Sequence, residues 1–280
     1  MNIPAPYFGT RDAAEIPKYT FPYQPIVHAG SREVVSYEAL IRGPNREGAP
    51  GILGQVPHAE KYRFDEESRV VAIELAARLK LSTWLNLNFL PRSLEQSRTA
   101  IDSTLSAARR CGIDADRIVI EVTEDEVIDD HAHFARAITQ KSVTCATHCR
   151  LHHRAPKLGM CRLNWRLLSN SYRRDGLRIA IDDFGAGYSG LNLLADFQPD
   201  IVKLDMKLVR GIESHGPRQA IVRAIAQASN DLGINVIAEG VETTDEYLWF
   251  RDEGITLFQG YLFARPGFEE LALPQFPNAR

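Results

Sequence analysis

The 280-residue chain has no apolar run long enough to form a membrane-spanning helix. Its first twenty residues, "MNIPAPYFGTRDAAEIPKYT", also lack the basic-then-apolar order of a secretory signal peptide. Only four cysteines are present, which is too few for a disulfide scaffold in a chain of this length. These absences argue against a small disulfide-stabilised secreted protein and favour a cytoplasmic location.

The chain also lacks a strong excess of charge of either sign. Its 33 Lys and Arg residues face 36 Asp and Glu residues, for a net charge of -3. The protein as a whole is therefore not expected to bind nucleic acid through bulk charge. Hydrophobic residues make up 44% of the sequence, which is enough to bury a sizeable core, and the length suits a single α/β barrel.

Short apolar runs alternate with amphipathic patterns along most of the chain. Strands are expected at residues 18–27, 32–43, 83–89, 116–124, 177–185, 200–205, 235–242 and 257–266. Helices are expected at residues 65–80, 93–112, 217–233 and 244–254, and another helix begins at 131–139.

Three details of these helices are predicted from residue type. Asp65 is the expected N-cap of the first helix, and Gly112 closes the second. The helix at 217–233 should present one apolar face, which consists of Ile221, Ile225, Ala228 and Leu232.

The strand pattern predicts the α/β class and, within it, a single (β/α)8 TIM-like barrel. About eight strands are expected, most followed by a helix, and they read as the continuous apolar runs of buried parallel strands. A doubly wound open sheet is the alternative, but no glycine-rich dinucleotide-binding pattern follows the first strand.

Polar residues, most of them acidic, mark the ends of the expected strands. They are Glu38, Asn88, Glu121, Glu124, Asp182, Asp183, Lys203, Asp205, Glu239, Glu242 and Gln259. In a barrel of this kind the carboxyl ends of the strands converge on the face that carries the chemistry. A lone acid at a strand end is usually a cap or turn residue, but so many carboxylates at one mouth would repel unless a cation lay among them. All-oxygen ligands favour Mg²⁺ or Mn²⁺.

The stretch "LRIAIDDFGAGYSGL" places two adjacent acids, Asp182 and Asp183, at the end of a buried strand. Adjacent residues on a regular strand point to opposite faces, so both can reach one site only where the chain turns. The nearby glycines, Gly185 and Gly187, permit such a turn.

The same residues carry a family resemblance. "YEALIRG", Tyr37 to Gly43, contains the Glu-Ala-Leu signature and resembles the EAL phosphodiesterases, which hydrolyse cyclic di-GMP. The segments "YQPIV", "LNFLP", "EVTE", "IAIDDFGAGYSGL", "VKLD", "VIAEGVE" and "FQGYLFARP" follow the family's order, between about Tyr19 and Phe268. The resemblance implies a barrel at residues 19–268, an N-terminal tail at 1–18 and a C-terminal tail at 269–280.

The resemblance also implies roles for single residues. Glu38, Asn88, Glu121 and Asp182 correspond to ligands of one metal, and Asp182, Asp183 and Glu239 to ligands of a second. Lys203 corresponds to the residue that orients the attacking water, Glu124 to an acid that holds the loop after Asp183, and Glu242 and Gln259 to supports of the metal site. The expected substrate contacts are Gln24, Leu40, Arg42, Asp205 and Gln259.

The activity that the resemblance implies is hydrolysis of cyclic di-GMP to linear pGpG with two Mg²⁺ or Mn²⁺ ions. Ca²⁺ is expected to inhibit, and a homodimer is expected. Since every motif residue that can be placed is present, an active enzyme is favoured over a receptor that binds cyclic di-GMP with weak or no turnover.

One region departs from the family pattern. Residues 140–171 form an insertion of about thirty residues between the expected fourth and fifth strands, long for a connection between elements. Residues 131–174 contain no Asp or Glu, nine Lys and Arg, and five of the eight His. The insertion is interpreted as an inert excursion, as a basic contact for nucleic acid or a partner, or as a zinc site. The candidate zinc ligands are Cys145, His148, Cys149, His152, His153 and Cys161.

Overall fold

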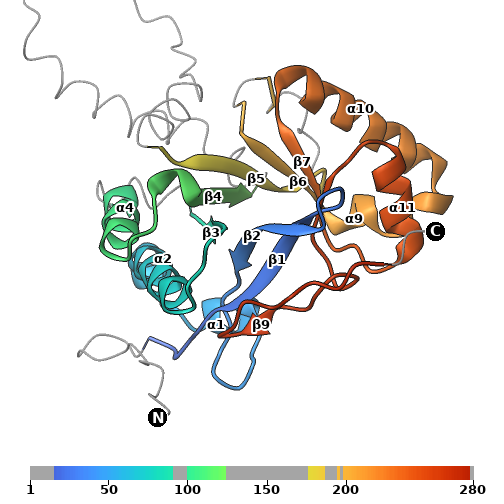
Figure 1. The fold of residues 1–280 in the computed structure, drawn as a ribbon. Helices are drawn as coiled ribbons and strands as arrows, with labels where there is room; N and C mark the ends of the chain where they lie inside the picture. The colour runs from blue at the N-terminus through green and yellow to red at the C-terminus, as the bar shows by residue number, and fades with distance from the viewer. Residues whose placement is uncertain (1–15, 91–99, 124–175, 187–193, 196–197, 278–280) are drawn as a thin grey trace, which may run out of the picture.

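The strands of the chain close into a barrel with helices on its outside (Figure 1). The structure is a computed structural model, and it describes residues 16–90, 100–123, 176–186, 194–195 and 198–277. The insertion at 140–171 and Glu124 lie outside these residues. Within the described part of the chain, no helix is both long and apolar enough to cross a membrane.

The barrel consists of eight strands in one closed order. They are β1 (Pro22–His28), β2 (Glu33–Ala39), β3 (Trp84–Asn88), β4 (Ile118–Thr123), β5 (Arg178–Phe184), β6 (Ile201–Leu204), β7 (Asn235–Ala238) and β8 (Leu257–Phe258). Each pairs with the next, and β1 pairs with both β8 and β2, which closes the ring. A short ninth strand, β9 (Gly267–Phe268), pairs with β1. The predicted (β/α)8 TIM-like fold is confirmed.

One strand departs from the expected parallel arrangement. β1 runs antiparallel to both β2 and β8, whereas the pairs from β2 to β8 are parallel. The reason is local, since only residues 29–32 separate β1 from β2, which is enough for a hairpin but too short for a helical crossover.

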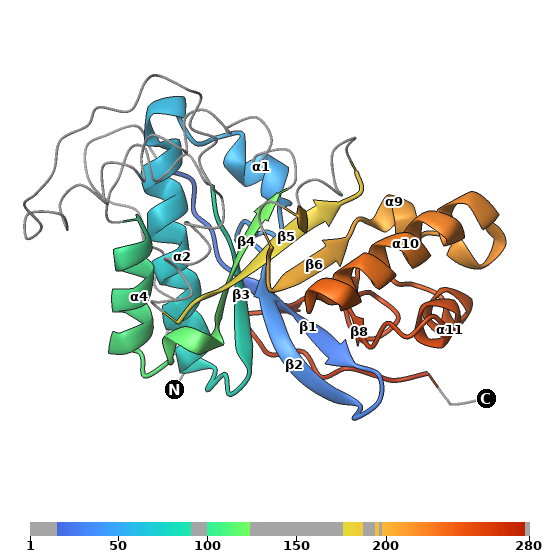
Figure 2. The ribbon, with the colours of Figure 1, turned by 90° about the horizontal axis from the view of Figure 1, so that it is seen from above.

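Helices cover the outside of the barrel (Figure 2). They are α1 (Ala49–Leu53), α2 (Lys61–Arg78), α4 (Ala100–Arg110), α9 (Met206–Val209), α10 (Gly216–Leu232) and α11 (Thr244–Asp252). Short 3₁₀ turns lie at His58–Glu60, Ala115–Arg117 and Ile212–Ser214. Gly112 follows α4 with a φ of 71°, so the predicted glycine closure of that helix is confirmed.

Two details predicted for the helices are wrong. α2 begins at Lys61, four residues before the expected cap, so Asp65 is a buried residue inside the helix. The buried residues of α10 are Val222, Ile225 and Ser229. Of the predicted face, Ile221 and Leu232 are instead about half exposed. The predicted face has the spacing of a helix, but the face of α10 that packs against the barrel is rotated from it by about one residue.

The last two barrel strands are shorter than expected. β7 ends at Ala238 and β8 at Phe258, where residues to 242 and 266 were predicted to continue as strand. The chain turns at both points, and Leu262 donates its backbone N–H to the carbonyl of Val241. Gly260 is required there, because a Cβ at this position would lie 2.0 Å from the Val241 oxygen.

The described part of the expected C-terminal tail packs on the barrel. Tyr37 donates its hydroxyl hydrogen bond to the carbonyl of Ala272, and the rings of Phe263 and Phe276 lie 5.7 Å apart. Gln275 donates its backbone N–H to Phe263.

Two apolar cores lie on opposite sides of the strand ring. The larger fills the space between strands and helices. The smaller fills the inside of the barrel and consists of Ile26, Val119, Ala180, Ile201 and Ile237, with Val35, Trp84 and Leu257 against it. We call these first five residues the barrel floor. They close the barrel below the polar side chains at the carboxyl ends of the strands.

Candidate metal and phosphodiester site

The polar site lies directly above the barrel floor because of the period of a strand. Side chains two residues apart point to the same face. Glu121 follows Val119, Asp182 follows Ala180, Lys203 follows Ile201, and Glu239 follows Ile237, each by two residues. The same strands therefore supply an apolar layer and, one step further along, a charged layer.

Lys203 lies at the centre of this charged layer. Its side chain is 1% exposed, and Nζ is 2.7 Å from an oxygen of Glu121 and 2.7 Å from one of Glu239. It also lies 3.2 Å from Asp182 and 3.3 Å from Glu38. Although burial alone would lower the pKa of Lys203, the four carboxylates together raise it well above its usual value. Lys203 is therefore a fixed cation and hydrogen-bond donor.

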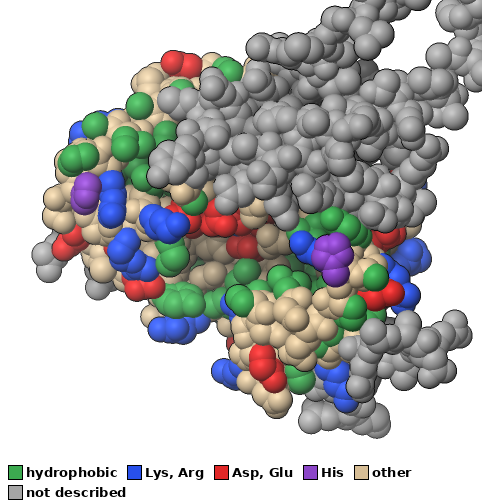
Figure 3. Space-filling view, turned by 180° about the vertical axis from the view of Figure 1, so that it is seen from behind, with side chains coloured by type: hydrophobic (Ala, Val, Ile, Leu, Met, Phe, Trp, Pro, Cys, Tyr) green, Lys and Arg blue, Asp and Glu red, His purple; other side chains and the backbone are tan. Residues whose placement is uncertain are grey.

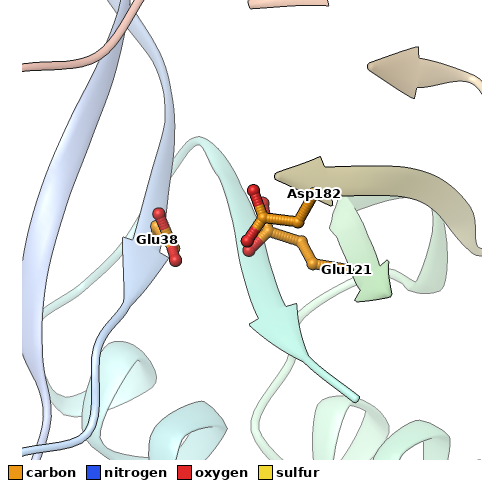
Figure 4. Close-up of side chains that lie close together, drawn as sticks. All are labelled: Glu38, Glu121 and Asp182. Carbon is orange, nitrogen blue, oxygen red and sulfur yellow. The ribbon is translucent and has the colours of Figure 1, made fainter. Parts of the chain in front are cut away.

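The carboxylates fall into two clusters that share Asp182. The first consists of Glu38, Glu121 and Asp182, and the second of Asp182, Asp183 and Glu239. Within each cluster, one oxygen from every residue lies within 4.8 Å of the others. Figure 4 shows the first cluster, with side chains from β2, β4 and β5 directed toward one another.

A break in β5 brings two adjacent acids to this site. The pairing of β5 with β6 shifts between Ile181 and Phe184, and Asp183 has a φ of 54°, in the left-handed region. Gly185 follows with a φ of 92°, and a Cβ there would lie 2.4 Å from Leu208. The irregular backbone explains how Asp182 and Asp183 belong to one cluster although they are neighbours in sequence.

Burial and crowding change the protonation of the acids. Burial first, and then the charges of Glu38 and Asp182, raise the pKa of Glu121 to about 8, against the opposing effect of Lys203. Burial, followed by Asp182 and Asp205, raises the pKa of Asp183 to about 6. Burial and the charge of Asp182 raise the pKa of Glu239 well above its ordinary value.

These acids fit divalent metal ions. Lys203 supplies one positive charge against the five carboxylates of the two clusters. The second oxygen of Glu121, Oε2, is buried and accepts no hydrogen bond from the described residues. A buried carboxylate oxygen without a donor is costly, and a hard cation would satisfy it. Figure 3 shows acidic side chains gathered in a hollow, with Lys and Arg side chains nearby on the same face.

Amide side chains at the ends of β3 and β8 support Glu38. Asn88 Nδ2 lies 3.3 Å from Glu38 Oε1, and Gln259 Nε2 lies 2.7 Å from Glu38 Oε2. Gln259 also donates to Gln24 on β1, at 3.2 Å, and Gln24 in turn donates to the carbonyl of Ala264. The structure thus brings Gln24, Asn88 and Gln259 to the edge of the first cluster.

The sequence interpretation did not include a second amide below Asn88. Asn86 donates from Nδ2 to Glu121 Oε1 at 2.8 Å and accepts a hydrogen bond from the Ser36 hydroxyl. Both residues are buried. The signal was present in "WLNLN", because the alternation of β3 puts Asn86 and Asn88 on the same inward face.

The remaining predicted residues lie around this centre. Asp205 caps α9 by accepting the Lys207 backbone N–H at 2.7 Å. Glu242 is exposed and forms an ion pair with Arg210 at 2.8 Å, outside both clusters. Leu40 and Arg42 follow β2 and are partly exposed, and Arg42 donates to the Ile41 carbonyl. Glu124 lies outside the described residues.

Comparison with known proteins identifies the family. The EAL domain family matches residues 10–266, so the chain belongs to this family. The chain is 32% identical over 259 residues to the blue light- and temperature-regulated antirepressor BluF of Escherichia coli, covering 91% of this chain and 57% of that protein. It is 25% identical to the probable cyclic di-GMP phosphodiesterase PdeD of Escherichia coli, covering 91% of this chain and 42% of that protein.

Solved structures agree with the fold and the family. The manganese and cyclic di-GMP complex of Klebsiella pneumoniae BlrP1 at pH 6 is 37% identical, with a TM-score of 0.79, and the match covers 94% of this chain and 59% of that one. A standalone EAL protein from Vibrio cholerae O395 with cyclic di-GMP bound is 37% identical, with a TM-score of 0.74, and the match covers 92% and 96% of the two chains. The chain thus spans a little over half of BluF and of BlrP1, but nearly all of the standalone protein.

Proposed function

We propose that this protein hydrolyses cyclic di-GMP to linear pGpG with two Mg²⁺ or Mn²⁺ ions. The observation that carries the proposal is the pair of carboxylate clusters that share Asp182 around Lys203. Membership of the EAL domain family and the cyclic di-GMP complexes of similar proteins support the choice of substrate.

The metal ligands in this proposal come from both clusters. Glu38, Asn88, Glu121 and Asp182 would hold one ion, and Asp182, Asp183 and Glu239 the other. When bound, the pair of ions would activate a water molecule and polarise the phosphodiester. The chain positions these ligands at the ends of five strands, whose hydrogen-bonded ring limits their relative movement.

Lys203 and the surrounding residues orient the reactants. Lys203 would donate a hydrogen bond to the attacking water and stabilise the negative charge on the phosphoryl oxygens. The water would lose a proton as its oxygen bonds to phosphorus, the bond between phosphorus and the ribose 3′ oxygen would break, and the 3′ oxygen would take up a proton to form the 3′-hydroxyl of pGpG. Gln24, Leu40, Arg42, Asp205 and Gln259 would contact the substrate, with Arg42 at a phosphate. Glu242 would support the site through its loop, and Glu124 would hold the loop after Asp183.

The decisive experiment is incubation of the purified protein with cyclic di-GMP and Mn²⁺ or Mg²⁺, followed by chromatography of the products. The expected product is pGpG, and none should form in the presence of EDTA. Ca²⁺ should inhibit. Formation of no pGpG by a folded, Mn²⁺-binding protein would overturn the proposal.

A second candidate function is a receptor that binds cyclic di-GMP without turnover. It is favoured by one observation, namely that a relative with 32% identity is named an antirepressor. In that case the ligand would bind without forming pGpG, and the same chromatography combined with a binding measurement separates the two. A homodimer is part of either proposal, and gel filtration with light scattering tests it.

A further inference from the structure

A buried ion pair lies outside the metal site, on the outer side of the strand ring. Arg69 Nη1 contacts Asp65 Oδ2 one turn earlier on α2, and their side chains are only 2% and 9% exposed. Removing two charges from water is costly, and a buried pair of this kind often adds little net stability compared with an apolar pair. Net stability is therefore a weak explanation for this buried ion pair, and its contacts indicate another role.

The partners of this pair connect three elements. Arg69 Nε donates to the Thr104 hydroxyl of α4 at 3.1 Å, and the guanidinium lies 4.6 Å from the centre of the Phe89 ring. Asp65 Oδ1 accepts the backbone N–H of Leu90 at 3.3 Å. Each of these side chains is buried, and the contacts join α2 and α4 to the residues that directly follow β3.

The anchored residues adjoin a candidate metal ligand. Asn88 is the last residue of β3, and its amide contacts Glu38. Phe89 still donates its N–H to the Glu121 carbonyl at 2.9 Å, and at Leu90 the amide turns to Asp65. Phe89 and Leu90 thus anchor the backbone after β3 to residues outside the barrel, while the Asn88 side chain points toward Glu38 inside it.

We propose that Asp65 and Arg69 are positioning residues for the metal site, because they fix the end of β3 and so the direction of the Asn88 side chain. This inference rests on the proposed function in so far as Asn88 is a metal ligand. An apolar pair could fill the same volume, but it could not accept the Leu90 amide or donate to Thr104.

The test is a double replacement, Asp65→Leu with Arg69→Met, which removes both charges of the pair together. The measured quantity is Mn²⁺ affinity by calorimetry, with no substrate present. The variant should fold, with a melting temperature close to that of the parent, and should bind Mn²⁺ about 10-fold more weakly, which is the low end of the loss typical for residues that support metal ligands.

The control is an exposed pair with the same spacing on the same helix. Arg63 and Glu67 form an i, i+4 ion pair at 2.9 Å with side chains 57% and 50% exposed. Replacing them by Met and Leu should leave Mn²⁺ affinity unchanged. Equal weakening in both double variants would overturn the inference, because it would reflect a general effect of altering α2.

A double-mutant cycle identifies the route of the effect. In an Asn88→Ala background the Asp65→Leu/Arg69→Met replacement should no longer change Mn²⁺ affinity, because the residue through which the pair acts is gone. An equal fall with and without Asn88, or unchanged affinity in a folded double variant, overturns the inference. If the double variant fails to fold, Thr104→Val replaces the hydroxyl that Arg69 contacts, and it should weaken Mn²⁺ binding measurably in the parent but not in the Asn88→Ala background.

The outcome is separable from that of the proposed function. A parent protein that binds Mn²⁺ but forms no pGpG would overturn the hydrolase and leave the positioning inference standing. A parent that binds no Mn²⁺ would overturn both.

Discussion

Two layers of side chains inside the same barrel differ in what they contribute. The barrel floor is apolar and fully buried, and its burial stabilises the fold. The layer above it gathers five carboxylates around Lys203, which places like charges at close range and costs stability. Along β4, β5, β6 and β7 the floor residue and the charged residue lie two positions apart, so one strand can contribute to stability at one position and to chemistry at the next inward-facing position.

The largest expected effect is loss of turnover on removal of an acid from the upper layer. Glu38→Ala should lower pGpG formation by about 1,000-fold or more, because it removes one carboxylate of the first cluster and the acceptor for Asn88 and Gln259. The circular dichroism spectrum should remain that of the parent. Glu33, exposed at the start of the same strand, is the control, and Glu33→Ala should retain full activity. Product formation by Glu38→Ala at the parental rate would contradict the proposed site.

Replacing the metal without changing the protein should also separate binding from turnover. Ca²⁺ prefers more ligands at longer distances than Mg²⁺, so it should support cyclic di-GMP binding while lowering turnover by about 100-fold or more. Calorimetry measures the binding and chromatography the product. Full activity in Ca²⁺ alone would show that the geometry of the two clusters is less demanding than proposed.

Lys203 offers a test of the charged layer without loss of a metal ligand. Lys203→Met keeps most of the side-chain volume and should lower turnover by about 100- to 1,000-fold, the range for removal of one group that stabilises developing charge. Mn²⁺ affinity should change little by comparison. Lys207, exposed on α9, provides the matched Lys207→Met control, which should be active. Loss of Mn²⁺ binding in Lys203→Met would assign this lysine to organising the ligands.

The floor should respond in the opposite way. Ile26→Ala removes a buried side chain of the floor and should lower the free energy of unfolding by about 2–5 kcal/mol. Turnover per folded molecule should stay near the parental value, since no ligand changes. Ile221→Ala, at a half-exposed position on α10, should cost much less. If Ile26→Ala lost activity without losing stability, the barrel floor would not have the purely structural role proposed here.

The upper layer could be predicted from the sequence because strand ends are easy to find. Apolar runs stop at polar residues, and the carboxyl ends of parallel strands meet at one mouth. The structure brings Glu121, Asp182, Lys203 and Glu239 together at this mouth, as the strand ends predict. Asn86 escaped this prediction because the residue lies inside a strand, where only its alternation with Asn88 marks it as inward-facing.

The parts that could not be predicted depend on tertiary contacts. The reversed direction of β1 follows from its hairpin with β2, and barrel closure requires it to pair with β8 as well. Asp65 has the residue type of an N-cap, but α2 starts earlier and the side chain is used instead to bind Arg69 and the amide of Leu90. Residue type alone does not distinguish a cap from a buried partner.

The smallest expected effect concerns the pH dependence of the metal-free protein. Folding raises the pKa of Asp183 to about 6, mainly by burial and the nearby Asp182 and Asp205. A carboxyl whose pKa is raised on folding binds its proton more tightly in the native state, so its contribution to stability is present below the unfolded pKa and is lost as pH rises through about 6. Because the side chain is partly exposed, the change should be about 1 kcal/mol after allowance for solvent screening. Glu121, with a pKa of about 8, should extend the decline to higher pH.

Urea unfolding in EDTA at several pH values measures how steeply the free energy of unfolding falls with pH, and Asp183→Asn should make this fall smaller around pH 6. With Mn²⁺ present, the free energy of unfolding should instead rise with pH, because metal binding favours the deprotonated ligands. A metal-free protein that becomes more stable as pH rises from about 6 to about 8, between the raised pKa values of Asp183 and Glu121, would contradict the proposed repulsion among the carboxylates of the upper layer.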